Sequence, residues 1–173
     1  MLENRKSYRI PFRGKFVYGD TQSVFTGNAL NISAGGIFVS SLNLLKRETH
    51  CQVLFQLRPE EQPICMEALV KRVSQSTADP EHIPGLGFQF IGDDKEDVKD
   101  RIESYMVECR KNYEVASTIL SAGEPDLRTI KNLLSNLHLP KFQDLGELRQ
   151  YVERVLRAIE LVDKNVEESP APL

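Results

Sequence analysis

Residues 31–39 read NISAGGIFV: a polar pair, two glycines and a short apolar run. Asn31 and Ser33 are two residues apart, so their side chains project from the same side of an extended strand. Gly35 and Gly36 allow the backbone to turn and allow another group to approach it closely. The Ile-Phe-Val run at 37–39 is typical of a strand, which places the polar pair at a strand end. This stretch therefore predicts a strand, a glycine turn and a second strand, with a ligand site at the turn.

A second polar motif, RKSYR, occupies residues 5–9 and precedes Pro11. Arg5 and Arg9 each offer a planar fork of donors, which suits phosphate oxygens or the O6/N7 edge of guanine. Residues 1–15 hold five basic side chains and one acidic side chain, although the whole chain has a net charge of −3. Such a local basic arm suits a small polyanion better than a long nucleic acid, whose binding surface is usually more extended.

The two motifs together resemble the PilZ domain, the bacterial receptor module for cyclic di-GMP. The family signature is RxxxR followed downstream by (D/N)xSxxG. Arg5 and Arg9 match the first half, and Asn31, Ser33 and Gly36 match the second half. The later strand GLGFQF at residues 85–90 also resembles the family. The resemblance covers about residues 3–92.

The resemblance implies a role for each matched residue. Arg5 and Arg9 grip phosphates and guanine, Asn31 and Ser33 hydrogen-bond a guanine edge or a phosphate, and Gly36 supplies clearance. From the residues alone, the arginines also fit a solvated basic terminus, and Asn-Ile-Ser fits a turn bonded by its own side chains. Arg72 is a weaker candidate, because a charge on that strand is better explained by exposure to solvent.

The pattern from Phe12 to Ile91 is one of short β-runs separated by turn residues. Six such strands in so short a stretch favour a small antiparallel β-barrel, and alternating apolar residues in two of them support it. We expect strands at residues 15–18, 23–31, 36–40, 52–57, 64–74 and 85–91.

Near Asp93 the spacing of the apolar residues changes from every second residue, typical of strands, to every third or fourth residue, typical of helices. A long helix is expected from Asp93 or Asp94 to Gly123, a second helix after Pro125 that ends before Pro140, and a third over residues 144–167. The predicted fold class is therefore α+β, a six-stranded antiparallel PilZ-like barrel followed by a three-helix extension. The expected domains are residues 1–92, the barrel with its basic arm, and residues 93–167, the helical region. Residues 168–173 are expected to be a disordered tail.

The third predicted helix has the most regular pattern in the chain. Its apolar residues alternate spacings of three and four over three heptads, with Leu156 beside the stripe: Leu145, Leu148, Val152, Val155, Ile159, Val162 and Val166. The pattern fits two arrangements, a helix that packs on the other two helices of its own chain and a seam between chains. The second arrangement predicts a homo-oligomer, a dimer or a tetramer.

Composition excludes several functional classes. Hydrophobic content of 40% and charged content of 27% are ordinary for a globular protein and give no general preference for nucleic acid or membrane. Three widely spaced cysteines without a CxxC pair argue against a disulfide framework or a zinc site and predict core thiols in a reducing compartment. The N-terminus lacks an apolar signal core, and no apolar run approaches the ~20 residues of a spanning helix, which predicts a cytoplasmic protein.

Two functions follow from these patterns, and neither is enzymatic, because no nucleophile, base or metal set is evident. The first is a receptor that binds cyclic di-GMP and no other cofactor, and signals to a protein effector through ordering of its basic arm. The second is a scaffold or assembly protein, in which nucleotide binding is weak or lost and the helices mediate oligomerisation.

Overall fold

The computed structural model describes residues 7–75, 83–92, 95–122, 126–135, 137 and 139–167. Arg5, the expected helix start at Asp93 or Asp94 and the expected tail at 168–173 lie outside these residues. The chain divides into two compact units. The barrel unit is Phe12–Tyr105, and the helical unit combines Met1–Pro11 with Met106–Leu173.

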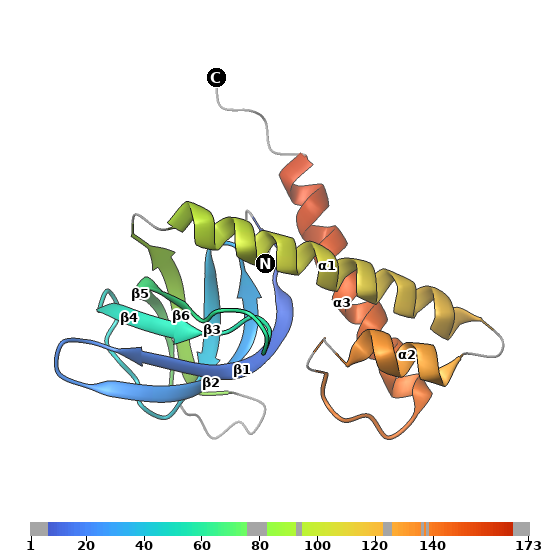
Figure 1. Cartoon of the computed structure of the whole chain (residues 1–173), viewed down its shortest axis with the longest axis horizontal. Helices are drawn as coiled ribbons and strands as arrows, with labels where there is room; N and C mark the ends of the chain where they lie inside the picture. Colours follow the sequence, from blue (N-terminus) through green and yellow to red (C-terminus); the bar gives the residue numbers. More distant parts are fainter. Residues whose placement is uncertain are drawn as a thin grey trace. The chain divides into compact units, whose positions relative to one another are not determined.

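Six antiparallel strands close into a barrel (Figure 1), which confirms the predicted fold class. Neighbouring strands follow the order β1-β2-β3-β6-β5-β4. Their bounds are β1 Ile10–Gly19, β2 Val24–Ser33, β3 Gly36–Ser40, β4 His50–Phe55, β5 Ile64–Ser74 and β6 Gly85–Ile91. Closure leaves the barrel without free strand edges, so the interior is fixed by the inward side chains of every strand.

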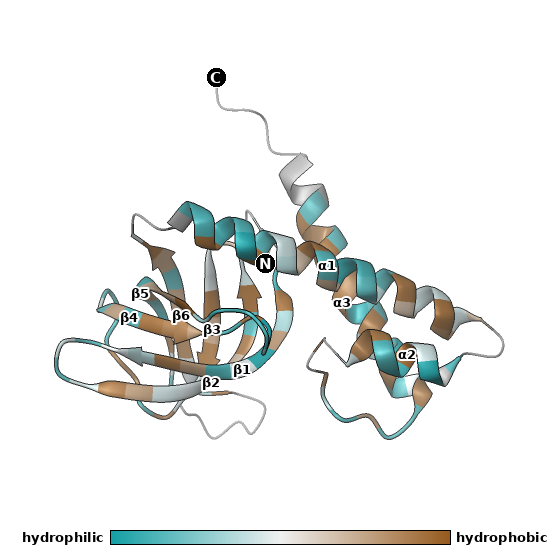
Figure 2. Ribbon diagram, viewed as in Figure 1, coloured by the Kyte–Doolittle hydropathy of each residue, from teal (hydrophilic) through white to brown (hydrophobic). Residues whose placement is uncertain are grey.

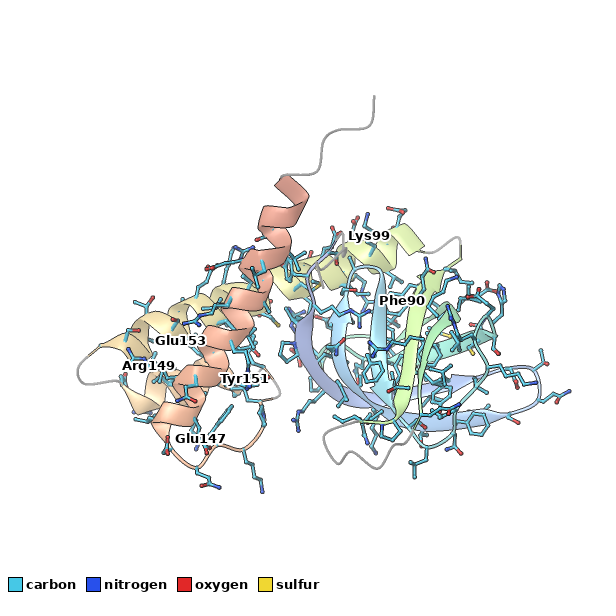
Figure 3. The ribbon with its side chains drawn as sticks, turned by 180° about the vertical axis from the view of Figure 1, so that it is seen from behind. Phe90, Lys99, Glu147, Arg149, Tyr151 and Glu153 are labelled. Carbon is cyan, nitrogen blue, oxygen red and sulfur yellow. The ribbon has the colours of Figure 1, made fainter. Side chains whose placement is uncertain are left out.

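The barrel interior is aromatic. The Phe55 and Phe90 rings stack with centroids 5.6 Å apart, and Phe16 lies 5.2 Å from Phe88. Phe90 is labelled on β6 in Figure 3. Apolar residues recur along the strands in Figure 2, because alternate side chains must enter this core. The alternation of apolar residues in the sequence therefore identified the side chains of the barrel core correctly.

Strand β1 is longer than predicted. It begins at Ile10 and not at Lys15, although Pro11 and Gly14 interrupt its propensity. Ile10 and Phe12 are 0% and 1% exposed, so burial outweighs the weak local preference. A proline lacks only one donor and is tolerated near the start of a strand.

Helix α1, Lys95–Ser121, contributes to both units. Its first turns belong to the barrel unit, where Val98, Ile102 and Tyr105 are buried and the Tyr105 ring meets Phe12 edge-on at 6.0 Å. The division between the two compact units therefore lies within α1, after Tyr105, and the domain boundary expected at residue 92 stays a prediction. The amphipathic stripe of one helix serves two cores, which a change of period cannot reveal.

The helical unit contains the rest of α1 together with α2, Leu127–Leu134, and α3, Leu145–Glu167. Asp126 caps α2 by accepting hydrogen bonds from the backbone N–H groups of Arg128 and Thr129. The apolar stripe of α3 is buried within this single chain at Leu148, Val152, Val155, Ile159 and Val162. These residues therefore form an intramolecular core, the first of the two arrangements that the heptads allowed, while Leu145 stays 41% exposed.

Candidate functional site

The hairpin of β2 and β3 carries the second half of the motif. Ser33 pairs with Gly36, Ile32 with Ile37, and Asn31 with Phe38. Ile32 and Ile37 are both 0% exposed and point into the barrel. Strand alternation assigns Asn31 and Ser33 to the opposite, outer face of the hairpin, which is the position that the proposed site requires.

Ser33 is bound within the hairpin itself. Its hydroxyl donates a hydrogen bond to the Gly36 carbonyl at 3.3 Å, and the residue is only 6% exposed. A hydroxyl oxygen keeps acceptor capacity when its proton is donated, so Ser33 can still accept a hydrogen bond from a guanine N–H. Asn31 follows a β-bulge between Ala29 and Asn31 and is half-buried. The bulge sets its direction on the outer face.

Gly36 has a structural role that the sequence did not reveal. A Cβ atom added there would lie 2.1 Å from the Phe88 carbonyl oxygen of β6, a distance that real Cβ contacts essentially never show. At the preceding Gly35 an added Cβ would meet nothing within 4 Å. Gly36 is thus required for strand packing, whereas its predicted clearance for a ligand stays a prediction.

Four residues form a lateral row across the outer face of the barrel, which we call the outer row: Asn31, Phe38, Gly87 and Arg72. Each pairs with the next across β2, β3, β6 and β5. The Arg72 guanidinium carbon lies 6.0 Å from the centroid of the Phe38 ring, within range of a cation–π contact. Gly87 leaves room for this contact, because a Cβ there would be 3.0 Å from the Arg72 Cβ.

The outer row adds a residue that the sequence analysis missed. Phe38 is half-buried although its neighbours Ile37 and Val39 are both 0% exposed, so its ring faces outward. An outward aromatic in an alternating strand was a visible signal for a binding surface. It also connects Arg72, the weaker candidate from the sequence, with the motif residue Asn31.

The first half of the motif belongs to the other unit. Arg9 is half-buried and lies just before β1, in the segment assigned to the helical unit. Arg5 lies outside the described residues. The structure therefore places Asn31, Ser33, Gly36 and Arg72 in one unit and Arg9 in the other.

The described residues contain no group of three or more His, Cys, Asp or Glu side chains that could hold a metal ion. Cys51 and Cys109 are buried as predicted, but Cys65 is exposed, because its outward position on β5 opposes the inward Ile64 and Met66. Within the same residues, no helix has both the length and the apolar character needed to cross a bilayer.

Residues 3–108 match the family model of the PilZ domain. Similar solved structures include MrkH from K. pneumonia in complex with c-di-GMP, with a TM-score of 0.52 and 21% identity over 62% of this chain and 53% of that chain. Another is YcgR from Escherichia coli in complex with c-di-GMP, with a TM-score of 0.51 and 18% identity over 65% of this chain and 50% of that one.

A further similar structure is the inhibitor of motility MotI from Bacillus subtilis, with a TM-score of 0.47 and 19% identity over 61% of this chain and 52% of that chain. The chain thus spans about half the length of these three proteins. A search of curated proteins found no match. At these identities the likeness to MrkH and YcgR shows a shared fold alone.

Proposed function

Because the chain belongs to the PilZ domain family, we propose that it is a receptor for cyclic di-GMP. The proposed site consists of Arg5, Arg9, Asn31, Ser33 and Gly36. One observation carries the proposal: both halves of the motif lie inside the matched residues 3–108, and the hairpin half presents Asn31 and Ser33 on one outer face. MrkH and YcgR, which share the fold, have been solved with this nucleotide.

Each proposed contact follows from the chemistry of the side chain. Arg5 and Arg9 donate forked hydrogen bonds to phosphate oxygens or to guanine O6 and N7. Asn31 offers an amide donor and acceptor to a guanine edge, and the Ser33 oxygen accepts a guanine N–H. The ligand carries two phosphates and two guanines, so two arginine forks and a polar hairpin match its groups in kind.

The outer row extends this site. Phe38 offers a flat apolar surface, and Arg72 above it offers a cation whose guanidinium can stack on a purine or bind a phosphate. Arg72 is exposed on β5 and is presented by a rigid barrel. We therefore include Arg72 as a secondary contact and Phe38 as its support.

Signalling would follow from binding of one nucleotide to both halves of the motif. A nucleotide that binds Arg9 and Asn31 together favours the conformations of the chain in which both side chains can reach it. We propose that binding orders the arm around Arg5 and changes the surface offered to a protein effector. This model requires only that the nucleotide binds those conformations more tightly than it binds the others.

Isothermal titration calorimetry with cyclic di-GMP tests the assignment. The parent protein is expected to bind with a micromolar or lower Kd, and Arg9→Ala is expected to lose about 1.5–3 kcal/mol, tenfold or more in affinity. Arg9→Lys should restore little of this loss, since lysine keeps the charge but not the fork. Cyclic di-AMP is the ligand control, because it has the same phosphates without the guanine edges. Equal binding by Arg9→Ala and the parent would rule out the proposed site.

The scaffold function is the alternative, and it predicts no heat of binding in the same titration. Self-association through the helices stays a prediction, but the α3 stripe no longer supports it, because those residues are buried within one chain. Of the described α3 residues, Leu161 is 62% exposed and Leu145 is 41% exposed. Such single exposed residues are common on protein surfaces and do not by themselves mark an interface.

A further inference from the structure

Strand β5 contains a bulge at Lys71, and the bulge decides which way Arg72 points. The even-numbered residues of β5 from 64 to 70 are buried in the barrel. Continued alternation would place Arg72 in the core as well. Instead, the register against β6 shifts between Val70 and Arg72, so that Arg72 pairs with Gly87 and both Lys71 and Arg72 are exposed. The bulge thus keeps an arginine out of an apolar core, where an unpaired charge would be very costly.

The end of the loop between β3 and β4 pairs with this bulge. The Glu48 N–H donates to the Val70 carbonyl at 2.7 Å, and the Val70 N–H donates to the Thr49 carbonyl at 3.0 Å. The Glu48 carboxylate accepts from Lys71, whose Nζ lies 3.2 and 3.1 Å from its two oxygens. Glu48 therefore holds two successive residues of β5, one through its backbone and the other through its side chain.

Glu48 makes these contacts from a strained backbone conformation. Its φ is +63°, and it is the one non-glycine residue with a positive φ in the part of the chain that the structure describes. It is the third residue of a turn that the Thr49 N–H closes on the Lys46 carbonyl at 3.3 Å. Glycine or asparagine is usual where a turn requires this conformation, because other side chains crowd the backbone. A glutamate at this position indicates a role for its side chain that glycine could not supply.

The ion pair leaves Arg72 as the available cation of the bulge. Glu48 neutralises Lys71. Among the residues that the structure describes, Arg72 has no ion-pair or hydrogen-bond partner, and its guanidinium carbon lies 6.0 Å from the centroid of the Phe38 ring. A guanidinium that rests only against an aromatic ring keeps its five N–H donors for a ligand. The two neighbouring cations of the bulge therefore differ, because one is paired and the other faces the outer row with its donors unused.

We propose that Glu48 is a positioning residue for cyclic di-GMP: it holds the β5 bulge in place and thereby presents Arg72 to the nucleotide on the outer row. The inference rests on the proposed function, in which Arg72 is a secondary contact, and adds a residue from a loop outside both halves of the motif. An exposed ion pair contributes little to stability, so this pair serves the direction of Arg72 more than the stability of the barrel. A guanidinium already directed at its ligand loses less conformational freedom on binding.

Glu48→Gly separates positioning from stability and from overall charge. Glycine suits a positive φ, so relief of strain offsets the lost ion pair and the urea midpoint should not fall. Loss of one negative charge by itself favours binding of an anionic nucleotide. Neither effect predicts weaker binding, whereas loss of positioning does. We expect the affinity for cyclic di-GMP, measured by calorimetry, to fall about two- to threefold, within the loss of about two- to fivefold expected for Arg72→Ala.

Two further variants complete the test. Glu103→Gln, on α1 in the barrel unit, also removes a negative charge and breaks an exposed ion pair, in which Lys99 Nζ lies 4.0 Å from Glu103 Oε1. This control should bind no more weakly than the parent. Lys99 is labelled on α1 in Figure 3. Glu48→Asn repeats the main variant with a residue that tolerates a positive φ and carries no carboxylate, and it decides the test if Glu48→Gly does not fold.

A double variant shows whether Glu48 acts through Arg72. If it does, Glu48→Gly should cost no affinity in an Arg72→Ala background. An equal cost in both backgrounds overturns the positioning role, and so does parental or tighter binding by Glu48→Gly. Parental binding by Arg72→Ala overturns it as well. In each of these results the parent protein still binds and the receptor function stands, whereas a parent protein that does not bind overturns both proposals.

Discussion

Replacing Gly36 by alanine should weaken the barrel, while the same replacement at Gly35 should not. The added Cβ at Gly36 would lie 2.1 Å from the Phe88 carbonyl oxygen and 3.2 Å from the Phe88 carbonyl carbon. Both are backbone atoms of β6, so no side-chain rotation relieves the overlap. The two strands must separate until the closest contact exceeds 3.0 Å, the lower limit for real Cβ atoms.

The magnitude follows from what this separation disturbs. Gly36 pairs with Gln89, and the Phe90 N–H donates to the Gly35 carbonyl at 3.0 Å, so a displaced strand loses part of this ladder. Overpacking costs about 1–3 kcal/mol and a weakened hydrogen bond about 0.5–1.5 kcal/mol. We expect Gly36→Ala to lower the free energy of unfolding by about 2–4 kcal/mol. Gly35 has open space around it and no positive φ. We therefore expect Gly35→Ala to change the free energy of unfolding by less than about 1 kcal/mol, with a small increase as the favoured direction.

Urea unfolding of the two variants measures the difference directly. The midpoint of Gly36→Ala should fall well below that of Gly35→Ala, with a similar slope for both. Equal midpoints would refute the steric argument. Calorimetry with cyclic di-GMP, performed where both variants are folded, then separates the two roles of Gly36. A stable Gly36→Ala protein that does not bind would favour ligand clearance over strand packing.

Three further predictions concern other parts of the chain. Arg72→Ala should lower cyclic di-GMP affinity by less than Arg9→Ala does, since an exposed cation–π or phosphate contact contributes about 0.5–1 kcal/mol, and calorimetry measures both. Val155→Glu should lower the melting temperature strongly, because Val155 is 8% exposed within the helical unit and an unpaired charge buried there is costly. Leu161→Glu is the control, and it should leave the melting temperature unchanged because Leu161 is 62% exposed. Sedimentation of the Leu161→Glu variant reports any association through that surface. Hydrogen bonds from the Thr129 hydroxyl and backbone hold the pKa of Asp126 below its ordinary value of 3.8, so α2 should lose stability as pH falls through this range, and Asp126→Asn should remove that dependence in circular dichroism melts.

The sequence identified most of the fold because each period was locally clear. Alternation over β4 and β6 and helical spacing in α1 and α3 each reflect one buried face, which a short window reveals. The start of β1 was missed because Pro11 and Gly14 lower its propensity, although Ile10 and Phe12 are both buried. Cys65 was expected in the core, and its exposure depends on strand register, which is set by pairing with distant residues.

The candidate site shows the same division between local and distant information. Asn31, Ser33 and Gly36 lie on one hairpin, so their shared position could be predicted from spacing. The outer row joins four strands across two bulges, and each bulge shifts the register by one residue. No spacing rule predicts that Arg72 reaches the ring of Phe38, because that proximity exists only after the barrel closes.

The heptads of α3 show that apolar periodicity cannot tell packing within one chain from packing between chains. A stripe of apolar residues at spacings of three and four requires a partner surface but does not specify whether the surface belongs to the same chain. In this chain Val152 and Ile159 are 0% and 1% exposed, because α1 and α2 supply buried stripes of their own in the same unit. Arg110 of α1 and Asp163 of α3 then add a polar link between these two helices, with Nη1 2.7 Å from Oδ2. The apolar stripe of α3 is therefore buried within this chain, and self-association of the helices stays a prediction that rests on other surfaces.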